Sequence, residues 1–165
     1  MTKQNKGFTL IELLVVISII GLLATLAVIA LGNARVKSRD AKRLSDVRQI
    51  QTALALYQTD RIDGSYPAGN ALVLGTGSSC AGSTPCLTIS ETNGIANTIA
   101  GRPYMGLVPA DPSSNSYVYT AYQSVAAANA CASVPCPWYR VTFTLEGAAG
   151  GLSAGAHYGD PNGLQ

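Results

Sequence analysis

Charged residues and histidine are scarce in this 165-residue chain. Lys, Arg, Asp and Glu together make up 12% of it, and His157 is its single histidine. With one histidine, four cysteines and no glycine-rich phosphate-binding loop, the sequence offers no set of side chains that would hold a metal ion or a nucleotide. We therefore expect no cofactor, no metal and no enzymatic activity.

One catalytic pattern does occur, and we interpret it as chance. Residues 151–155 read Gly-Leu-Ser-Ala-Gly, with His157 and Asp160 close behind. A nucleophile elbow needs a strand, a sharp turn and a helix in a large sheet, with its histidine and acid reaching in from separate loops. Three residues so close together in a glycine-rich tail cannot meet that geometry.

What the chain does have is a long apolar segment near its start. Residues 8–34 carry one charged side chain, Glu12. As a helix, this segment would be about 40 Å long, enough to cross a hydrocarbon core of about 30 Å. Because it is apolar on every side, lipid or other helices must surround it. The small residue Gly7 lies between a leader that contains Lys3 and Lys6 and the first apolar residue, Phe8. Cleavage after Gly7 would therefore keep the apolar helix in the mature protein.

Glu12 is a functional candidate because a carboxylate within a membrane span is energetically costly. Cleavage between Gly7 and Phe8 would place a new amino group on Phe8, four residues before Glu12. Within one chain the geometry of such a pair is unfavourable. Our hypothesis is that the Phe8 amine of one subunit pairs with Glu12 of a staggered neighbour and so neutralises both charges.

Residues 6–16 read Lys-Gly-Phe-Thr-Leu-Ile-Glu-Leu-Leu-Val-Val. This stretch resembles the class III signal of type IV pilins and type II secretion pseudopilins. The resemblance implies cleavage between Gly7 and Phe8 by a prepilin peptidase/methylase and N-methylation of Phe8. It also implies a subunit anchored in the bacterial inner (cytoplasmic) membrane with its head outside the cytoplasm, whose helix later forms the core of a cell-surface filament.

An amphipathic helix is expected to continue from the apolar one and to end near Asp60. Its apolar positions recur every three or four residues, and they are Leu44, Val47, Ile50, Leu54 and Tyr57, widened by Ala41 and Ala53. Six basic residues lie from Arg35 to Arg48, with Asp40 and Asp46 to offset them. We expect a solvated helix face; contact with lipid headgroups and binding of DNA are the alternatives.

Beyond residue 60 the sequence predicts one small head. Residues 117–123 are rich in aromatic and β-branched residues, and residues 139–146 alternate apolar with polar, so we expect a strand at each. Residues 64–116 show little periodicity, with a short helical or extended piece near 95–100, and the last twenty residues are expected to form an irregular edge. The fold class is α+β, with a long N-terminal helix packed on a small antiparallel sheet, because so small a head needs the helix to complete its core.

Residues 107–112, followed by Tyr117, Val118 and Tyr119, resemble the loop and strand of the major secretion pseudopilin. The calcium site of that family is reduced here to Asp160, so we assign no calcium.

The four cysteines stand in two local pairs. We expect two disulfides that close short loops, Cys80 with Cys86 and Cys131 with Cys136. Cross-pairing would instead join the two loops. A zinc site is the competing interpretation. However, five and four residues separate the cysteines of the two pairs, more than the two that are typical of zinc sites, and His157 is the single histidine.

Lys and Arg counts alone would place the C-terminal part in the cytoplasm, but the leader signal and the cysteines both indicate export. We expect a cleaved leader (1–7), a transmembrane and filament-core helix (8–34), an amphipathic helix (35–60) and an exported head (61–165). The predicted function is that of a structural subunit of a type IV pilus-like filament. Its partners would be further copies in a helical filament, the prepilin peptidase/methylase, the inner-membrane assembly platform, minor pilins, and membrane lipid before assembly. The alternatives are a pseudopilin of a type II secretion system and a competence-type pilin that captures DNA.

Overall fold

One long helix, α1 (Leu10–Asp60), precedes all the strands of the chain that the structure describes. The structure is a computed structural model, and it describes residues 8–75, 88–113, 115–127 and 129–165. The chain divides into two compact units, residues 1–36 and residues 37–165. Helix α1 contributes its apolar part to the first unit and its amphipathic part to the second. It ends at Asp60, the end that the sequence pattern predicts.

Most of the described residues of the first unit belong to the apolar part of α1. From Leu10 to Arg35 every residue of the helix is exposed, including Leu10, Ile11 and Leu22. By length and composition this part of α1 is able to cross a membrane. Because its apolar side chains lie on all sides of the helix, this unit needs lipid or other helices around it.

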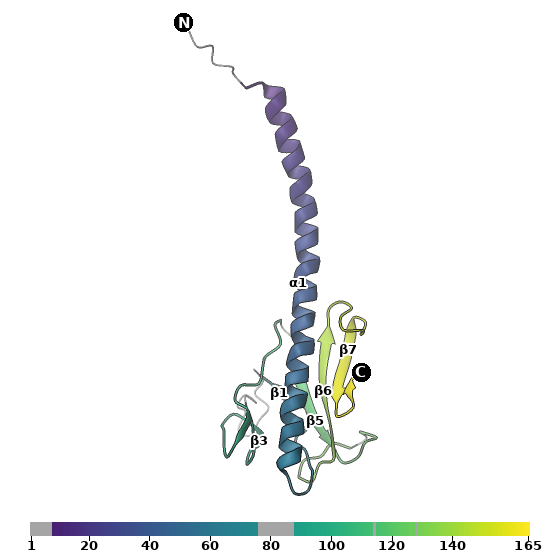
Figure 1. Ribbon diagram of the computed structural model, residues 1–165. Coiled ribbons are helices and arrows are strands. Elements are labelled where there is room, and N and C mark those ends of the chain that lie inside the picture. The colour runs from purple at the N-terminus through teal and green to yellow at the C-terminus, as the bar shows by residue number, and fades with distance from the viewer. Residues whose placement is uncertain (1–7, 76–87, 114, 128) are drawn as a thin grey trace. The chain divides into compact units, whose positions relative to one another are not determined.

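The second unit is built on a five-stranded antiparallel sheet (Figure 1). The strand order is β1-β5-β6-β7-β8, with β1 (Leu72–Leu74), β5 (Tyr117–Tyr122), β6 (Trp138–Leu145), β7 (Gly155–Asp160) and β8 (Gly163–Leu164). A smaller sheet has the order β3-β2-β4, with β2 (Thr88–Ser90), β3 (Gly94–Ala96) and β4 (Pro103–Met105). The α+β fold class is therefore confirmed, and so are the two strands that the sequence predicts.

The sheet packs on the apolar stripe of α1, as expected. Every second side chain of β5 and β6 is buried, and the members of this set are Tyr117, Tyr119, Ala121, Tyr139, Val141, Phe143 and Leu145. The stripe residues Val47, Ile50 and Leu54 have no exposed surface. Gly159 of β7 makes the close approach feasible, because a Cβ there would lie 2.8 Å from Cγ1 of Val47. Ala41 is exposed and does not widen the stripe.

The prediction of an irregular C-terminal edge was wrong. Strand β7 pairs with β6 in continuous register, for example Phe143 with His157, and β8 folds back on β7. The glycine-rich sequence hides this strand because it shows no apolar alternation. Strand β6 nevertheless has backbone N–H and C=O groups that need partners on that side, and β7 supplies them. The strands of the smaller sheet have three residues each, too few to show a period.

Cys131 and Cys136 form a disulfide, with their Cα atoms 5.8 Å apart. The predicted local pairing is confirmed here, and a zinc role for these two sulfurs is excluded because they are bonded to each other. Cys80 and Cys86 lie outside the described residues.

Replacing both Cys131 and Cys136 by alanine is expected to lower the free energy of unfolding by about 2 kcal/mol, because a disulfide over so short a loop restricts the unfolded chain only modestly. Chemical denaturation of the full chain in detergent measures this change. Ser133→Ala, within the same loop, is the matched control and should leave the midpoint unchanged. Equal midpoints for the double variant and the control would contradict the stabilising role.

Candidate functional site

The N-terminus of α1 is closed by a capping box made by Thr9 and Glu12. The backbone N–H and the hydroxyl of Thr9 donate to Glu12 Oε2, at 2.9 and 2.7 Å. In return, the Glu12 backbone N–H donates to Thr9 Oγ1 at 3.3 Å. Such reciprocal bonds satisfy the free N–H groups at the start of a helix. Sequence reasoning missed this role, although the pattern Thr-x-x-Glu before an apolar run is its known signature.

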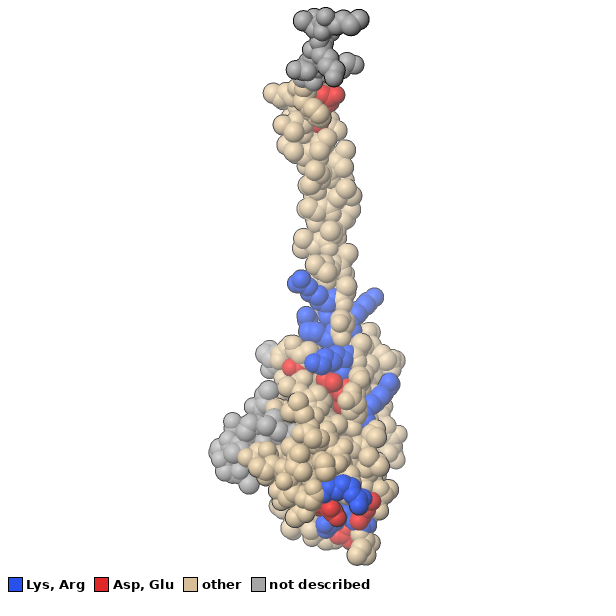
Figure 2. All heavy atoms as spheres, turned by 60° about the vertical axis from the view of Figure 1, so that its left-hand side comes forward, with Lys and Arg blue, Asp and Glu red and all other residues tan. Residues whose placement is uncertain are grey.

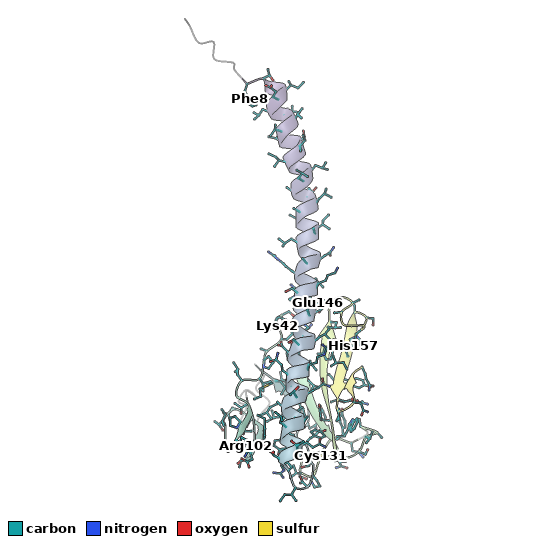
Figure 3. All side chains as sticks on the ribbon, viewed as in Figure 1. Phe8, Lys42, Arg102, Cys131, Glu146 and His157 are labelled. Carbon is teal, nitrogen blue, oxygen red and sulfur yellow. A yellow bond between two sulfur atoms is a disulfide. The ribbon has the colours of Figure 1, made fainter. Side chains whose placement is uncertain are left out.

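The capping box occupies one oxygen of the Glu12 carboxylate. Among the described residues, Glu12 Oε1 has no hydrogen-bond partner, so this oxygen is available to a cation from outside the chain. Ile11, Val15 and Val16 flank Glu12 and Phe8 in an apolar surface groove. Figure 3 labels Phe8, a residue that is 83% exposed at this end of α1. The Glu12 carboxylate is therefore oriented by the capping box and lies on an exposed apolar surface.

A second polar cluster lies inside the second unit around Arg43, which has no exposed surface. Its guanidinium forms a fork with Asp111, from Nε to Oδ2 at 2.7 Å and from Nη2 to Oδ1 at 3.1 Å. Nη1 donates to Asp40 at 2.6 Å and Nη2 donates to Ser113 Oγ at 2.6 Å. Glu146 Oε1 lies 2.8 Å from Nη2. Arg43 thus has a partner for each nitrogen of its guanidinium.

The carboxylates of this cluster connect α1 to two loops. Asp40 accepts hydrogen bonds from the backbone N–H groups of Glu146 (3.0 Å) and Gly147 (2.7 Å), directly after β6. Arg39 also binds Glu146, from Nε to Oε1 at 2.8 Å and through a second contact of its Nη2. Asp111 lies in the loop that precedes β5. The expectation of a solvated basic face was therefore wrong for Arg43 and Asp40, because the loops bring acidic partners that the helix sequence does not contain.

The comparisons with known proteins support what these features indicate. Residues 2–28 match the family model described as the prokaryotic N-terminal methylation motif. The chain is 34% identical over 117 residues to the type II secretion system core protein G of Escherichia coli (strain K12). The aligned region covers 71% of this chain and 72% of the relative. This chain belongs to the family of type IV pilins and type II secretion pseudopilins. This pilin-family chain is also 38% identical over 78 residues to the type IV major fimbrial protein FimA of Dichelobacter nodosus, 47% of either chain. No solved structure gives a significant match.

In the tail of this pilin-family chain, the structure shows which contacts His157 and Asp160 of the catalytic pattern make. His157 Nε2 lies 2.8 Å from the backbone oxygen of Ser153, not from its hydroxyl. Asp160 is buried and accepts a hydrogen bond from the backbone N–H of Asn162 in the turn between β7 and β8. The relatives reported above are structural subunits rather than enzymes.

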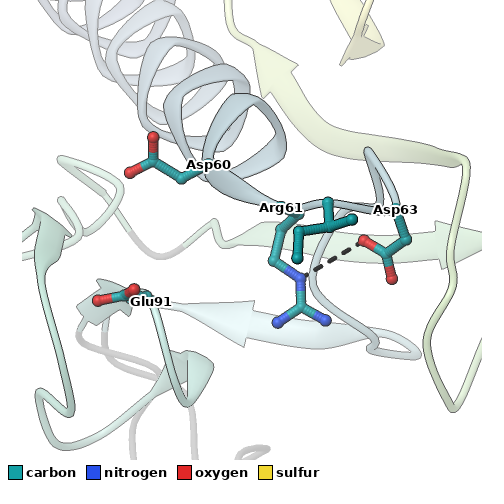
Figure 4. A pocket seen from close by; sticks show the side chains of 5 residues that line it. Asp60, Arg61, Asp63 and Glu91 are labelled. Atoms are coloured by element: carbon teal, nitrogen blue, oxygen red, sulfur yellow. Dashed lines mark ion pairs between the residues drawn. The ribbon is translucent and has the colours of Figure 1, made fainter.

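A shallow pocket follows the end of α1 in the pilin-family chain (Figure 4), and it is lined by Asp60, Arg61, Ile62, Asp63 and Glu91. Its carboxylates are already engaged. Asp63 pairs with Arg61 at 3.5 Å and accepts from the Ser65 backbone N–H, the local bond expected of Asp in a turn. Asp60 pairs with Arg102 at 2.7 Å. No group of three or more metal-ligating residues exists in the part of the chain that the structure describes.

Acid is expected to destabilise the second unit through the Arg43 cluster. Hydrogen bonds from Arg39 and Arg43 lower the pKa of Glu146 to about 2. Burial would raise the pKa of Asp111, but hydrogen bonds from Arg43 and Ser113 outweigh it and lower that pKa. Carboxyl groups in the unfolded chain titrate near about 4. Their stabilising contribution is therefore complete above about pH 4 and is lost as the pH falls towards about 2.

The measurement is the midpoint of chemical denaturation between about pH 5 and pH 2, with Glu146→Gln expected to flatten the profile. Asp46→Asn is the control of opposite sign, because burial raises the pKa of Asp46 and its removal should steepen the loss. A Glu146→Gln profile as steep as that of the native chain would contradict this role of the cluster.

Proposed function

We propose that this chain is the structural subunit of a type IV pilus-like filament, assembled through α1 after its leader is removed. The observation that carries the proposal is the combination at the N-terminus. A methylation motif covers residues 2–28, and the helix that follows it exposes apolar side chains on every side with a single carboxylate near its start. A helix that is apolar on every side is unfavourable in water, and the core of a filament would bury it.

The proposed pathway begins in the bacterial inner membrane, where residues 8–34 hold the subunit with its head outside the cytoplasm. A prepilin peptidase cleaves between Gly7 and Phe8 and methylates the new Phe8 amine. The Phe8 amine then binds Glu12 of a neighbouring subunit, whose Oε1 is free to accept it while Oε2 stays in the capping box. Neutralising both charges removes the main cost of burying this end of the helix among copies of itself.

The small residues of the apolar segment suit this packing. Gly21 and Gly32 have open space around them, so neighbouring backbones are free to approach closely there. In the filament, the second unit would form the outer layer, and its Cys131–Cys136 disulfide would protect an exposed loop.

The second candidate is a pseudopilin, the periplasmic filament subunit of a type II secretion system. Its support is the 34% identity with the core protein G of Escherichia coli over 117 residues, which extends beyond the N-terminal helix. The two candidates share processing and fold, and they differ in whether the filament reaches the cell surface. The DNA-capturing alternative has less support, because Arg43 and Arg39 are engaged by carboxylates inside the protein.

The experiment that tests the proposal is mass spectrometry of the N-terminus in material sheared from the cell surface, with the membrane fraction measured beside it. We expect a chain that begins at N-methylated Phe8 and is abundant in the sheared material. The same processed chain found in membranes alone would favour the pseudopilin. An intact Met1 in both fractions would overturn the processing and leave a simple membrane-anchored domain.

A further inference from the structure

Three basic side chains on the part of α1 that belongs to the second unit remain without an ion-pair partner at the surface, and we name Lys37, Lys42 and Arg48 the basic collar. All three residues are exposed, and none has an ion-pair partner within 4 Å among the residues that the structure describes. Figure 2 shows Lys and Arg side chains gathered around α1 at one end of the second unit, and Figure 3 labels Lys42 there. The other two cations between Lys37 and Arg48 are Arg39 and Arg43, and both are bound to carboxylates.

The acidic residues of the same stretch do not neutralise the collar. Asp40 is 1% exposed and bound to Arg43 and to two backbone N–H groups. Asp46 is 6% exposed and accepts a hydrogen bond from the Tyr117 hydroxyl at 3.0 Å. Lys42 acts on Asp46 electrostatically without forming an ion pair with it. Folding therefore buries the carboxylates of Asp40 and Asp46 and leaves the cations of the collar exposed to solvent. The sequence alone does not reveal this separation of charges.

The place of the collar in the chain indicates its ligand. Lys37 and Lys42 follow the apolar segment 8–34 by three and eight residues, which corresponds to at most about 12 Å along a helix. Polar headgroups extend about 5–8 Å beyond the hydrocarbon core on either side of a bilayer. Long basic side chains reach several ångströms along the helix axis to place their charge at that depth. Arg48 lies 14 residues beyond the apolar segment, about 21 Å along a helix, so the negative potential of an anionic surface reaches it only at low ionic strength.

We propose that the basic collar binds the phosphate groups of anionic phospholipids in the leaflet on the side of the head, while the subunit waits in the membrane. This inference rests on the proposed function, because it requires the apolar segment to span the bilayer. Anionic lipid around the neck of the subunit would hold the head against the membrane surface. The collar thereby adds an electrostatic anchor to the apolar one, and this second anchor weakens as salt rises.

The test uses the full chain reconstituted in phosphatidylcholine vesicles that contain a trace of spin-labelled lipid. We expect labelled phosphatidylglycerol to be immobilised at the protein in preference to labelled phosphatidylcholine, and 1 M NaCl to reduce this preference. In Lys37→Gln/Lys42→Gln the preference should fall by about fivefold or more. The matched control is Arg61→Gln/Arg102→Gln, which removes the same charge at residues paired with Asp63 and Asp60 and should keep the native preference.

A native preference in Lys37→Gln/Lys42→Gln would overturn the proposal, as would equal immobilisation of both lipids by the native chain. Resistance to alkaline extraction, measured on the same vesicles, separates this failure from that of the proposed function. A chain that stays in the bilayer without lipid preference defeats the collar alone, whereas a chain that washes off defeats both. Binding of short duplex DNA to the detergent-solubilised chain, lost in the collar variant and accompanied by no lipid preference, would assign the collar to DNA and also overturn the proposal.

Discussion

Glu12→Gln is expected to abolish filament assembly while the chain remains inserted in the membrane. Glutamine is accepted at this position of a capping box, so the hydrogen bonds with Thr9 are retained and α1 still begins at Leu10. The substitution removes the negative charge alone. Without it, the proposed Phe8 amine would enter the apolar filament core as an unpaired cation, which costs several kcal/mol for each subunit. The measurement is the amount of filament in sheared material, with membrane-bound subunit as the reference.

Thr9→Ala is the matched control that separates the two roles of Glu12. It removes the hydroxyl of the capping box and weakens the start of α1 by about 1 kcal/mol, but it leaves the carboxylate charged and frees it further for a neighbour. We expect Thr9→Ala to assemble. If Glu12→Gln assembles normally and Thr9→Ala does not, Glu12 serves the helix start and the charge-pairing hypothesis is wrong.

Arg43→Met is expected to lower the free energy of unfolding by about 3–5 kcal/mol, a large part of the stability of a small domain. Methionine fills similar space but leaves Asp40 and Asp111 buried with less than their full set of partners, and an uncompensated buried charge is costly. The same change also releases the link between α1 and the two loops that carry Asp111 and Glu146. Chemical denaturation of the full chain in detergent, followed by the fluorescence of Trp138, measures the loss.

Two further variants make this result specific to the cluster. Arg48→Met removes an exposed cation from the same helix and should change the free energy of unfolding by no more than about 0.5 kcal/mol. Adding Asp111→Asn to Arg43→Met should recover part of the stability, because it removes one of the unpaired charges. A loss for Arg43→Met no larger than that for Arg48→Met would show that the cluster does not hold the fold together.

The sequence by itself determined the elements whose signal is local. The unbroken apolar segment, the position of Glu12 within it and the Gly7–Phe8 junction are properties of a few consecutive residues, and they sufficed to identify the family. The period of Leu44, Val47, Ile50 and Leu54 fixed the buried face of α1, and the alternation along β6 fixed its two faces. In each case the chain's own spacing decides which side chains share a face.

The tertiary structure decided the features that depend on partners distant in the sequence. Arg43 is buried because Asp111, 68 residues away, lies beside it, and no pattern in the helix announces that partner. Strand β7 forms because β6 needs hydrogen-bond partners and because Gly159 lets Val47 approach, not because its sequence alternates. The basic collar likewise emerges only after folding has withdrawn Asp40 and Asp46 into the interior. Burial of a charge is set by what surrounds it, and that is known only when the chain has folded.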